Sequence, residues 1–197
     1  ELVKPDKVYD LPDYAKYLLM NTNTSFCQSE VEDAEQLLAE IQAIEAEVLE
    51  AIPGFVGKMK ALESKMEAYH SMEELWQRFL QTKTVTPEEL EAVTAAKMSC
   101  EKRTLAKYSY MTAYNHLCRG EVAKARNIFE NRTLQLTEKT SLRVEDVKGL
   151  PGEVAAMKAM FRGMSELDVA WQRYVETGVS PGFDAELPFF SCYPIPK

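Results

Sequence analysis

Apolar residues recur at intervals of three and four along most of the chain between residues 29 and 178. The clearest runs are Val31, Ala34, Leu38 and Ile41 near one end, and Val154, Met157, Phe161 and Met164 near the other. This spacing places apolar side chains on one face of a helix. No segment alternates apolar and polar residues over more than about five positions, as a half-buried strand does. We therefore predict an all-α fold: a bundle of about five helices, mostly antiparallel, with irregular N- and C-terminal arms fastened to it.

Turn and capping residues divide this pattern into segments. Ser29, Ser71 and Thr86 each precede a Glu by three positions, as in a capping box. We predict helices over residues 29–52, 55–80, 86–119, 121–139 and 153–178, with a break in the second helix at Ser71. The whole chain, residues 1–197, is predicted to be one helical domain. Its parts are an N-terminal arm over 1–28, with a short helix at 13–20 and a polar turn at 21–25, the bundle over 29–178 and a C-terminal strap over 179–197.

The net charge is concentrated in one predicted helix. The chain has 31 acidic and 23 basic residues, for a net charge of −8. Eight of the acidic residues, and no Lys or Arg, lie between Ser29 and Ile52. Such a surface attracts a partner with a basic surface, and a chain of this charge is not expected to bind nucleic acid. We predict partner binding through Glu32, Glu35, Glu40 and Glu47; the alternative is an ordinary solvated helix face.

Four cysteines bear on the compartment. Cys100 and Cys118 are 18 residues apart in one predicted helix, a rise of about 27 Å, so they cannot bond to each other. We predict the disulfides Cys27–Cys100 and Cys118–Cys192, each fastening an arm to this helix; the alternative is four free thiols. Disulfides indicate an extracytoplasmic location, periplasmic or secreted. The chain starts at Glu1 without a recognisable leader, which indicates a processed or trimmed product.

Few residues have the spacing of a catalytic or metal site. Glu67 and His70 have the Glu-x-x-His spacing of a di-iron site, but His116 lacks the matching Glu, so they are weak metal candidates and a polar helix end is the alternative. Asp168 interrupts the last apolar stripe and is either a buried, paired acid or turned to solvent. No nucleophile elbow, phosphate-binding loop or zinc motif occurs. We predict no catalytic residue and no cofactor.

Three classes of function follow from these patterns. The leading one is a non-enzymatic extracytoplasmic protein that acts through protein–protein interaction, as an inhibitor, immunity factor, adhesin or assembly component. The alternative is a binder of an apolar small molecule or haem in the bundle interior, because the chain has nine methionines and two histidines. The third is an enzyme with an unrecognised site around Glu67 and His70. No apolar run reaches the roughly 20 residues needed to cross a bilayer, so we predict that the chain does not span a membrane.

Overall fold

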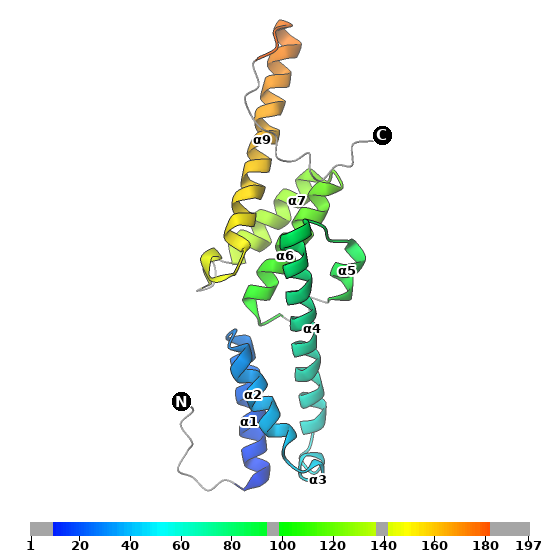
Figure 1. The fold of residues 1–197 in the computed structure, drawn as a ribbon, viewed down its shortest axis with the longest axis vertical. Coiled ribbons are helices and arrows are strands. Elements are labelled where there is room, and N and C mark those ends of the chain that lie inside the picture. Colours follow the sequence, from blue (N-terminus) through cyan, green and yellow to red (C-terminus); the bar gives the residue numbers. More distant parts are fainter. Residues whose placement is uncertain (1–9, 94–98, 137–141, 182–197) are drawn as a thin grey trace. The chain divides into compact units, whose positions relative to one another are not determined.

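The computed structural model describes residues 10–93, 99–136 and 142–181 (Figure 1). The chain is all-α, as predicted, and no strand occurs within these residues. It divides into two compact units. Unit 1 consists of residues 1–75 and 92–105, and unit 2 consists of residues 76–91 and 106–197. Three helices, α4 (Phe55–Thr82), α5 (Pro87–Ala92) and α6 (Lys102–Cys118), therefore contribute residues to both units.

Much of the predicted N-terminal arm is a helix. Helix α1 spans Leu11–Cys27. Asp10 caps it through a hydrogen bond of 2.9 Å to a backbone amide of the first turn. The polar residues 21–25, predicted as a turn, are helical: the Thr22 and Thr24 hydroxyls donate to carbonyls four residues earlier, at 2.8 and 3.0 Å. These bonds satisfy the hydroxyls inside the helix, so they do not terminate it.

The predicted acidic helix is two helices. Helix α2 spans Val31–Gln42 and α3 spans Ala46–Glu50, with an extended backbone at Glu45 between them. The predicted capping box at Ser29 is wrong. An N-cap residue needs an extended backbone, whereas Ser29 is left-handed with φ +66°. Its hydroxyl instead donates to the carboxylate of Glu101.

Helix α4 spans Phe55–Thr82 without interruption. It follows a turn in which Gly54 adopts φ +77°, as the Pro-Gly pair predicts. The predicted break at Ser71 is wrong. The Ser71 hydroxyl donates to the Glu67 carbonyl within the same helix, at 3.0 Å, so it is not available to cap a new one.

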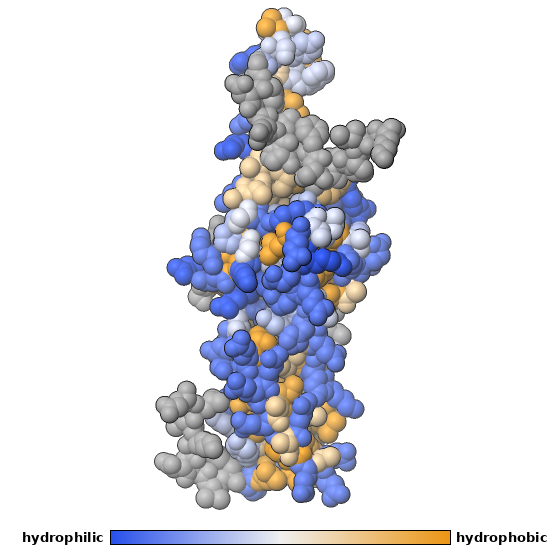
Figure 2. All heavy atoms as spheres, in the orientation of Figure 1, coloured by the Kyte–Doolittle hydropathy of each residue, from blue (hydrophilic) through white to orange (hydrophobic). Residues whose placement is uncertain are grey.

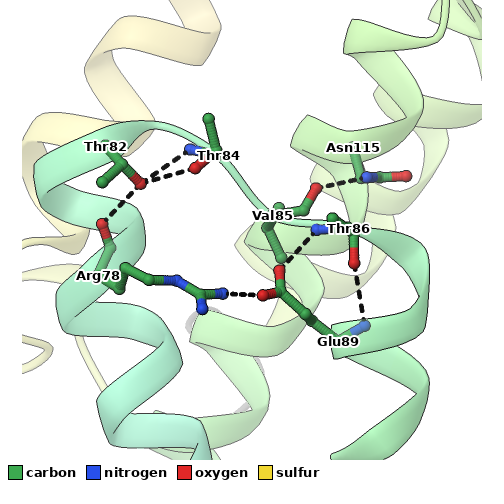
Figure 3. Close-up of polar contacts among 7 residues, drawn as sticks. All are labelled: Arg78, Thr82, Thr84, Val85, Thr86, Glu89 and Asn115. Atoms are coloured by element: carbon green, nitrogen blue, oxygen red, sulfur yellow. Dashed lines mark hydrogen bonds and ion pairs between the residues drawn. The ribbon is translucent and has the colours of Figure 1, made fainter.

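The capping box predicted at Thr86 is confirmed (Figure 3). It starts helix α5, Pro87–Ala92. Thr86 Oγ1 accepts from the Glu89 amide at 3.2 Å, and Glu89 Oε2 accepts from the Thr86 amide at 2.9 Å. Arg78 of α4 pairs with the same carboxylate. The Thr86 amide and then the Arg78 guanidinium hold the pKa of Glu89 below its ordinary value.

The predicted helix over 86–119 is not continuous. Helix α5 ends at Ala92, and α6 spans Lys102–Cys118. Glu101, completely buried, starts α6 by accepting from the amides of Arg103 and Thr104 at 3.3 and 2.5 Å. Gly120, with φ +78°, follows the end of α6, where the sequence predicted a stop. Asn115 of α6 donates to the Val85 carbonyl at 2.8 Å and so contacts the turn before α5 (Figure 3).

The predicted fourth helix changes its winding partway. Helix α7 spans Val122–Ile128, and a π-helical segment, η2, continues it over Phe129–Leu134. The buried hydroxyls of Ser109 and Thr133 lie 3.0 Å apart and join η2 to α6. The end predicted at residue 139 lies outside the described residues.

The last helix is longer than predicted at its start. After a single turn, η3, over Val144–Asp146, helix α9 spans Leu150–Thr177. It begins within the predicted loop because Gly149 adopts φ +84° and Pro151 fits the first turn. Gly178, with φ +69°, ends it as predicted. The apolar stripe that the sequence places in the core is buried only in the first half of α9; in the second half it is exposed.

Unit 1 has a mainly aliphatic core with residues from four helices, α1 to α4. Helices α1 and α2 are antiparallel neighbours, and α2 is antiparallel to α4 (Figure 1). The buried residues of its two core clusters include Ala15, Leu18, Phe26, Leu37, Leu38, Ile41, Leu62 and Met66. Helix α2 therefore packs against both α1 and α4.

Unit 2 has an aromatic core around α6. The rings of Trp76, Phe79, Tyr110, Tyr114, Phe129 and Phe161 form a connected set with neighbouring centroids 5.0 to 6.5 Å apart. Met111 and Leu117 of α6 are also buried. Buried residues therefore lie on more than one side of α6.

Candidate functional site

The acids predicted to bind a partner lie on two helices of unit 1. Glu32, Glu35 and Glu40 belong to α2, and Glu47 belongs to α3. Glu35 is half-buried, whereas the other three are exposed. Because the backbone breaks at Glu45, these acids do not share the single helix face that was predicted.

Two of the four acids also have partners inside unit 1. The Glu35 carboxylate lies 2.7 Å from His70 Nε2 of α4. Tyr14 of α1 donates to Glu40 Oε2 at 3.1 Å, and partial burial and then this carboxylate raise the pKa of Tyr14. Glu35 and Glu40 therefore connect α2 to its neighbours, which leaves Glu32 and Glu47 as the better candidates for attracting a basic partner.

The weak metal candidates, Glu67 and His70, line one hollow between α2 and α4. The hollow has a volume of about 360 Å³ and also contains Glu35 and Glu63. Within the described ranges, no group of three or more His, Cys, Asp or Glu residues is arranged to hold a metal ion. The His70 imidazole is instead paired with Glu35.

A disulfide joins α1 to the segment before α6. Cys27 and Cys100 are bonded, with their Cα atoms 4.9 Å apart, and this is the pairing predicted from sequence. Beside it, the Ser29 hydroxyl contacts Glu101. None of the described cysteines is a free thiol. Cys192, the predicted partner of Cys118, lies outside the described residues, so that bond stays a prediction.

An open groove lies between α1 and α4 of unit 1. It has a volume of about 780 Å³, and its lining residues are Leu19, Met20, Asn23, Thr24, Lys58, Ala61, Leu62 and Lys65. Leu62 belongs to the core and Met20 is 65% exposed, so apolar surface extends from the core to the solvent. Lys65 Nζ donates to Asn23 Oδ1 across the groove at 3.1 Å.

Lysines give this groove a charge opposite to that of the chain. Lys58 and Lys65 are seven positions apart on α4, about 10 Å along one helix face. Among the described residues that line the groove, none is acidic. The groove was not predicted from sequence, because α1, which forms one wall, lies in the segment read as an arm.

In unit 2, a buried carboxylate of α9 contacts side chains of other elements and so holds them together. Glu153 of α9 is largely buried and pairs with Lys83, while Tyr110 donates to its Oε2 at 3.2 Å and to its carbonyl at 2.8 Å. Burial and then the Glu153 charge raise the pKa of Tyr110 well above its ordinary value. Asp168, the other acid considered as buried, is exposed on α9.

These features define an all-α protein with an open, lysine-lined apolar groove and an acidic surface in unit 1. Comparison of the chain with family models, with curated proteins and with solved structures found no match. No helix among the described residues is long and apolar enough to cross a membrane.

Proposed function

We propose that this chain is a non-enzymatic, extracytoplasmic interaction protein whose unit 1 binds an acidic amphipathic helix of another protein. The observation that carries this proposal is the groove between α1 and α4. Its floor is apolar at Leu19, Ala61 and Leu62, and two lysines stand along one side. A helix that inserts an apolar face into such a groove is a common mode of peptide recognition.

The separation of the two lysines matches about two turns of a bound helix. Lys58 and Lys65 are two turns apart on α4. A bound helix with apolar residues at positions i, i+3, i+4 and i+7 would cover the floor between them. The exposed thioether of Met20 can adapt to different apolar side chains at the edge.

Charge complementarity selects the kind of helix. Carboxylates that flank the apolar face of the bound helix would contact Lys58 and Lys65, whereas lysines there would be repelled. The acidic residues Glu32 and Glu47 lie outside this groove. We propose that they attract a basic region of the same partner and so set its orientation.

The proposed location follows from the cysteines. A disulfide such as Cys27–Cys100 persists in an oxidising compartment and is rare in the cytosol. A thiol titration of denatured, unreduced protein tests this part: four reactive thiols would remove the argument for a periplasmic or secreted location.

Two designed peptides test the groove. Each has about 18 residues and the same leucine stripe, and they differ only in carrying Glu or Lys beside the stripe. Fluorescence anisotropy of the labelled peptides is expected to show binding of the Glu peptide to the wild-type chain and binding of the Lys peptide at least about tenfold weaker. The variant Lys58→Glu/Lys65→Glu is expected to reverse this preference.

A control separates the groove from overall charge. Lys60→Glu/Lys158→Glu changes the net charge by the same amount at two exposed residues outside the groove. It should leave the preference for the Glu peptide intact. Equal binding of both peptides, binding of neither, or the same reversal in the control variant would each contradict the proposal.

The same groove is the observation that favours a second candidate function, binding of an anionic apolar small molecule. A single carboxylate can contact only one of two lysines about 10 Å apart, and the groove is open to solvent, so it encloses a small ligand poorly. Dodecanoate serves as the probe. Calorimetry that shows dodecanoate binding abolished in Lys58→Glu, together with no binding of either peptide, would support this second function.

A further inference from the structure

The apolar face of α9 continues past the core of unit 2. In the first half of the helix the residues of this face, among them Val154, Met157 and Phe161, are buried. In the second half the same spacing continues through Leu167, Trp171 and Tyr174, but these side chains are 36%, 58% and 44% exposed. We call these three residues, with Ala170 between them, the α9 stripe.

An exposed apolar stripe of this kind indicates a binding surface for another segment or molecule. The Trp171 and Tyr174 rings lie side by side with centroids 5.8 Å apart. Large aromatic residues dominate the energetics of surfaces that bind another segment. Hydrophobic residues reach the surface along this half of α9 (Figure 2).

The chain turns back onto this stripe directly after the helix. The Gly178 amide donates to the Tyr174 carbonyl at 2.8 Å, and the left-handed conformation of Gly178 reverses the chain. Ser180 and Pro181 then line one hollow, of about 270 Å³, together with the four residues of the α9 stripe. The last described residue, Pro181, therefore lies beside the stripe.

We propose that the α9 stripe is a docking surface for the chain's own C-terminal segment, residues 182–197. From Leu167 to Tyr174 the stripe rises about 10 Å, which roughly three extended residues span. The segment has sixteen residues, and its apolar members are Phe183, Ala185, Leu187, Phe189, Phe190, Tyr193 and Ile195. Its length and composition therefore suffice to cover the stripe.

Tethering favours this segment over other occupants. The segment directly follows Pro181, which lies beside the stripe, so its effective concentration there exceeds that of a free partner. Pro188, Pro194 and Pro196 disfavour a helix and favour an extended chain that can lie along the α9 stripe. The predicted Cys118–Cys192 bond would hold the far end of the segment to unit 2.

Trp171 reports on this contact in the intact protein. The chain has two tryptophans, and Trp76 is completely buried, so acrylamide quenches chiefly Trp171. Removal of residues 182–197 is expected to raise the quenching constant at least about twofold, because the ring loses its cover, and to shift the emission to longer wavelength. A synthetic peptide of residues 182–197, added to the shortened chain, should reverse both changes, whereas a scrambled peptide should not.

A second variant keeps the full chain. Phe189→Ser/Phe190→Ser retains Cys192 and is expected to raise the quenching constant in the same direction, with unchanged helical circular dichroism in both variants. Equal quenching of Trp171 in all three proteins would overturn the proposal. Protection that depends on protein concentration would also overturn it, since the cover would then be a second copy. The peptide experiment on the unit 1 groove does not depend on this outcome.

Discussion

Two buried carboxylates, Glu101 and Glu153, illustrate how single residues hold the helices of this chain. Each is nearly or completely buried, where an unpaired charge is costly. Ser29 donates to Glu101 and Lys83 pairs with Glu153, although each partner is 70 or more positions away in the sequence. Both carboxylates also accept protein hydrogen bonds beside these distant contacts, which satisfies further lone pairs. These two acids therefore fix contacts between elements distant in the sequence.

Ser29→Ala tests the contact with Glu101. The change leaves a buried carboxylate without one of its donors, so we expect the free energy of unfolding to fall by about 1–3 kcal/mol. Ser71→Ala is the matched control, because the Ser71 hydroxyl donates to an exposed carbonyl of its own helix, and its effect should stay within about 0.5 kcal/mol. Urea unfolding measures both; equal losses would show that the Ser29 hydroxyl adds nothing specific.

The environment of Tyr69 leads to a prediction about the stability of the fold at alkaline pH. Burial, and then the carboxylates of Glu73, Glu101 and Glu35, raise its pKa to about 12, whereas an unfolded tyrosine titrates near pH 10. The folded state therefore retains the Tyr69 proton to a higher pH than the unfolded state does. This contribution to stability is complete below about pH 10 and is lost as the pH rises towards 12.

Tyrosinate absorbance measures the Tyr69 titration directly. Tyr69→Phe keeps the ring that packs edge-on against Phe26, with centroids 6.1 Å apart, and removes only the phenol. The variant should lose one late-titrating tyrosine and show a shallower loss of stability between about pH 10 and 12. An absorbance curve that loses a tyrosine titrating near pH 10 instead would contradict the raised pKa.

At the scale of elements, the two ends of α9 each have a glycine in the same left-handed backbone conformation, so the cost of replacing them can be compared. Gly149 and Gly178 both have positive φ, +84° and +69°. A Cβ atom at Gly149 would lie 2.6 Å from Leu80 Cδ1, whereas one at Gly178 would meet nothing within 4 Å. We expect Gly178→Ala to cost about 1 kcal/mol from the backbone alone and Gly149→Ala to cost more. Thermal unfolding of the two variants checks the order, and a larger loss for Gly178→Ala would refute it.

Capping patterns show which helix boundaries a sequence determines. Ser29, Ser71 and Thr86 have the same spacing to a Glu, yet among these three only the Thr86 hydroxyl bonds to the amide of that Glu. The other two hydroxyls bond elsewhere, Ser71 to its own helix and Ser29 to Glu101. Local patterns thus predicted that helices exist, whereas contacts distant in the sequence decided where several of them begin.

At the scale of the whole molecule, the charged surfaces were easier to predict than the groove. The acidic run of α2 and α3 is contiguous in sequence, so Glu32 and Glu47 could be proposed as partner-binding residues from the sequence alone. Lys58 and Lys65 can be recognised as groove residues only in the structure, where α1 lies beside α4. The groove forms only where α1 and α4 lie side by side. The sequence predicted the segment that contains α1 as an irregular arm, so the groove was missed.

The disulfide Cys27–Cys100 links positions 73 residues apart. Closing a loop of this length restricts the unfolded chain, and the chain-entropy estimate is roughly 4 kcal/mol. We expect Cys27→Ser/Cys100→Ser to lower the free energy of unfolding by about 2–4 kcal/mol, since Ser29 and Glu101 keep part of the contact between α1 and α6. Urea unfolding of the variant beside the wild-type chain, each with and without reductant, separates this bond from any other. A variant as stable as the unreduced wild type would show that this bond does not stabilise the fold.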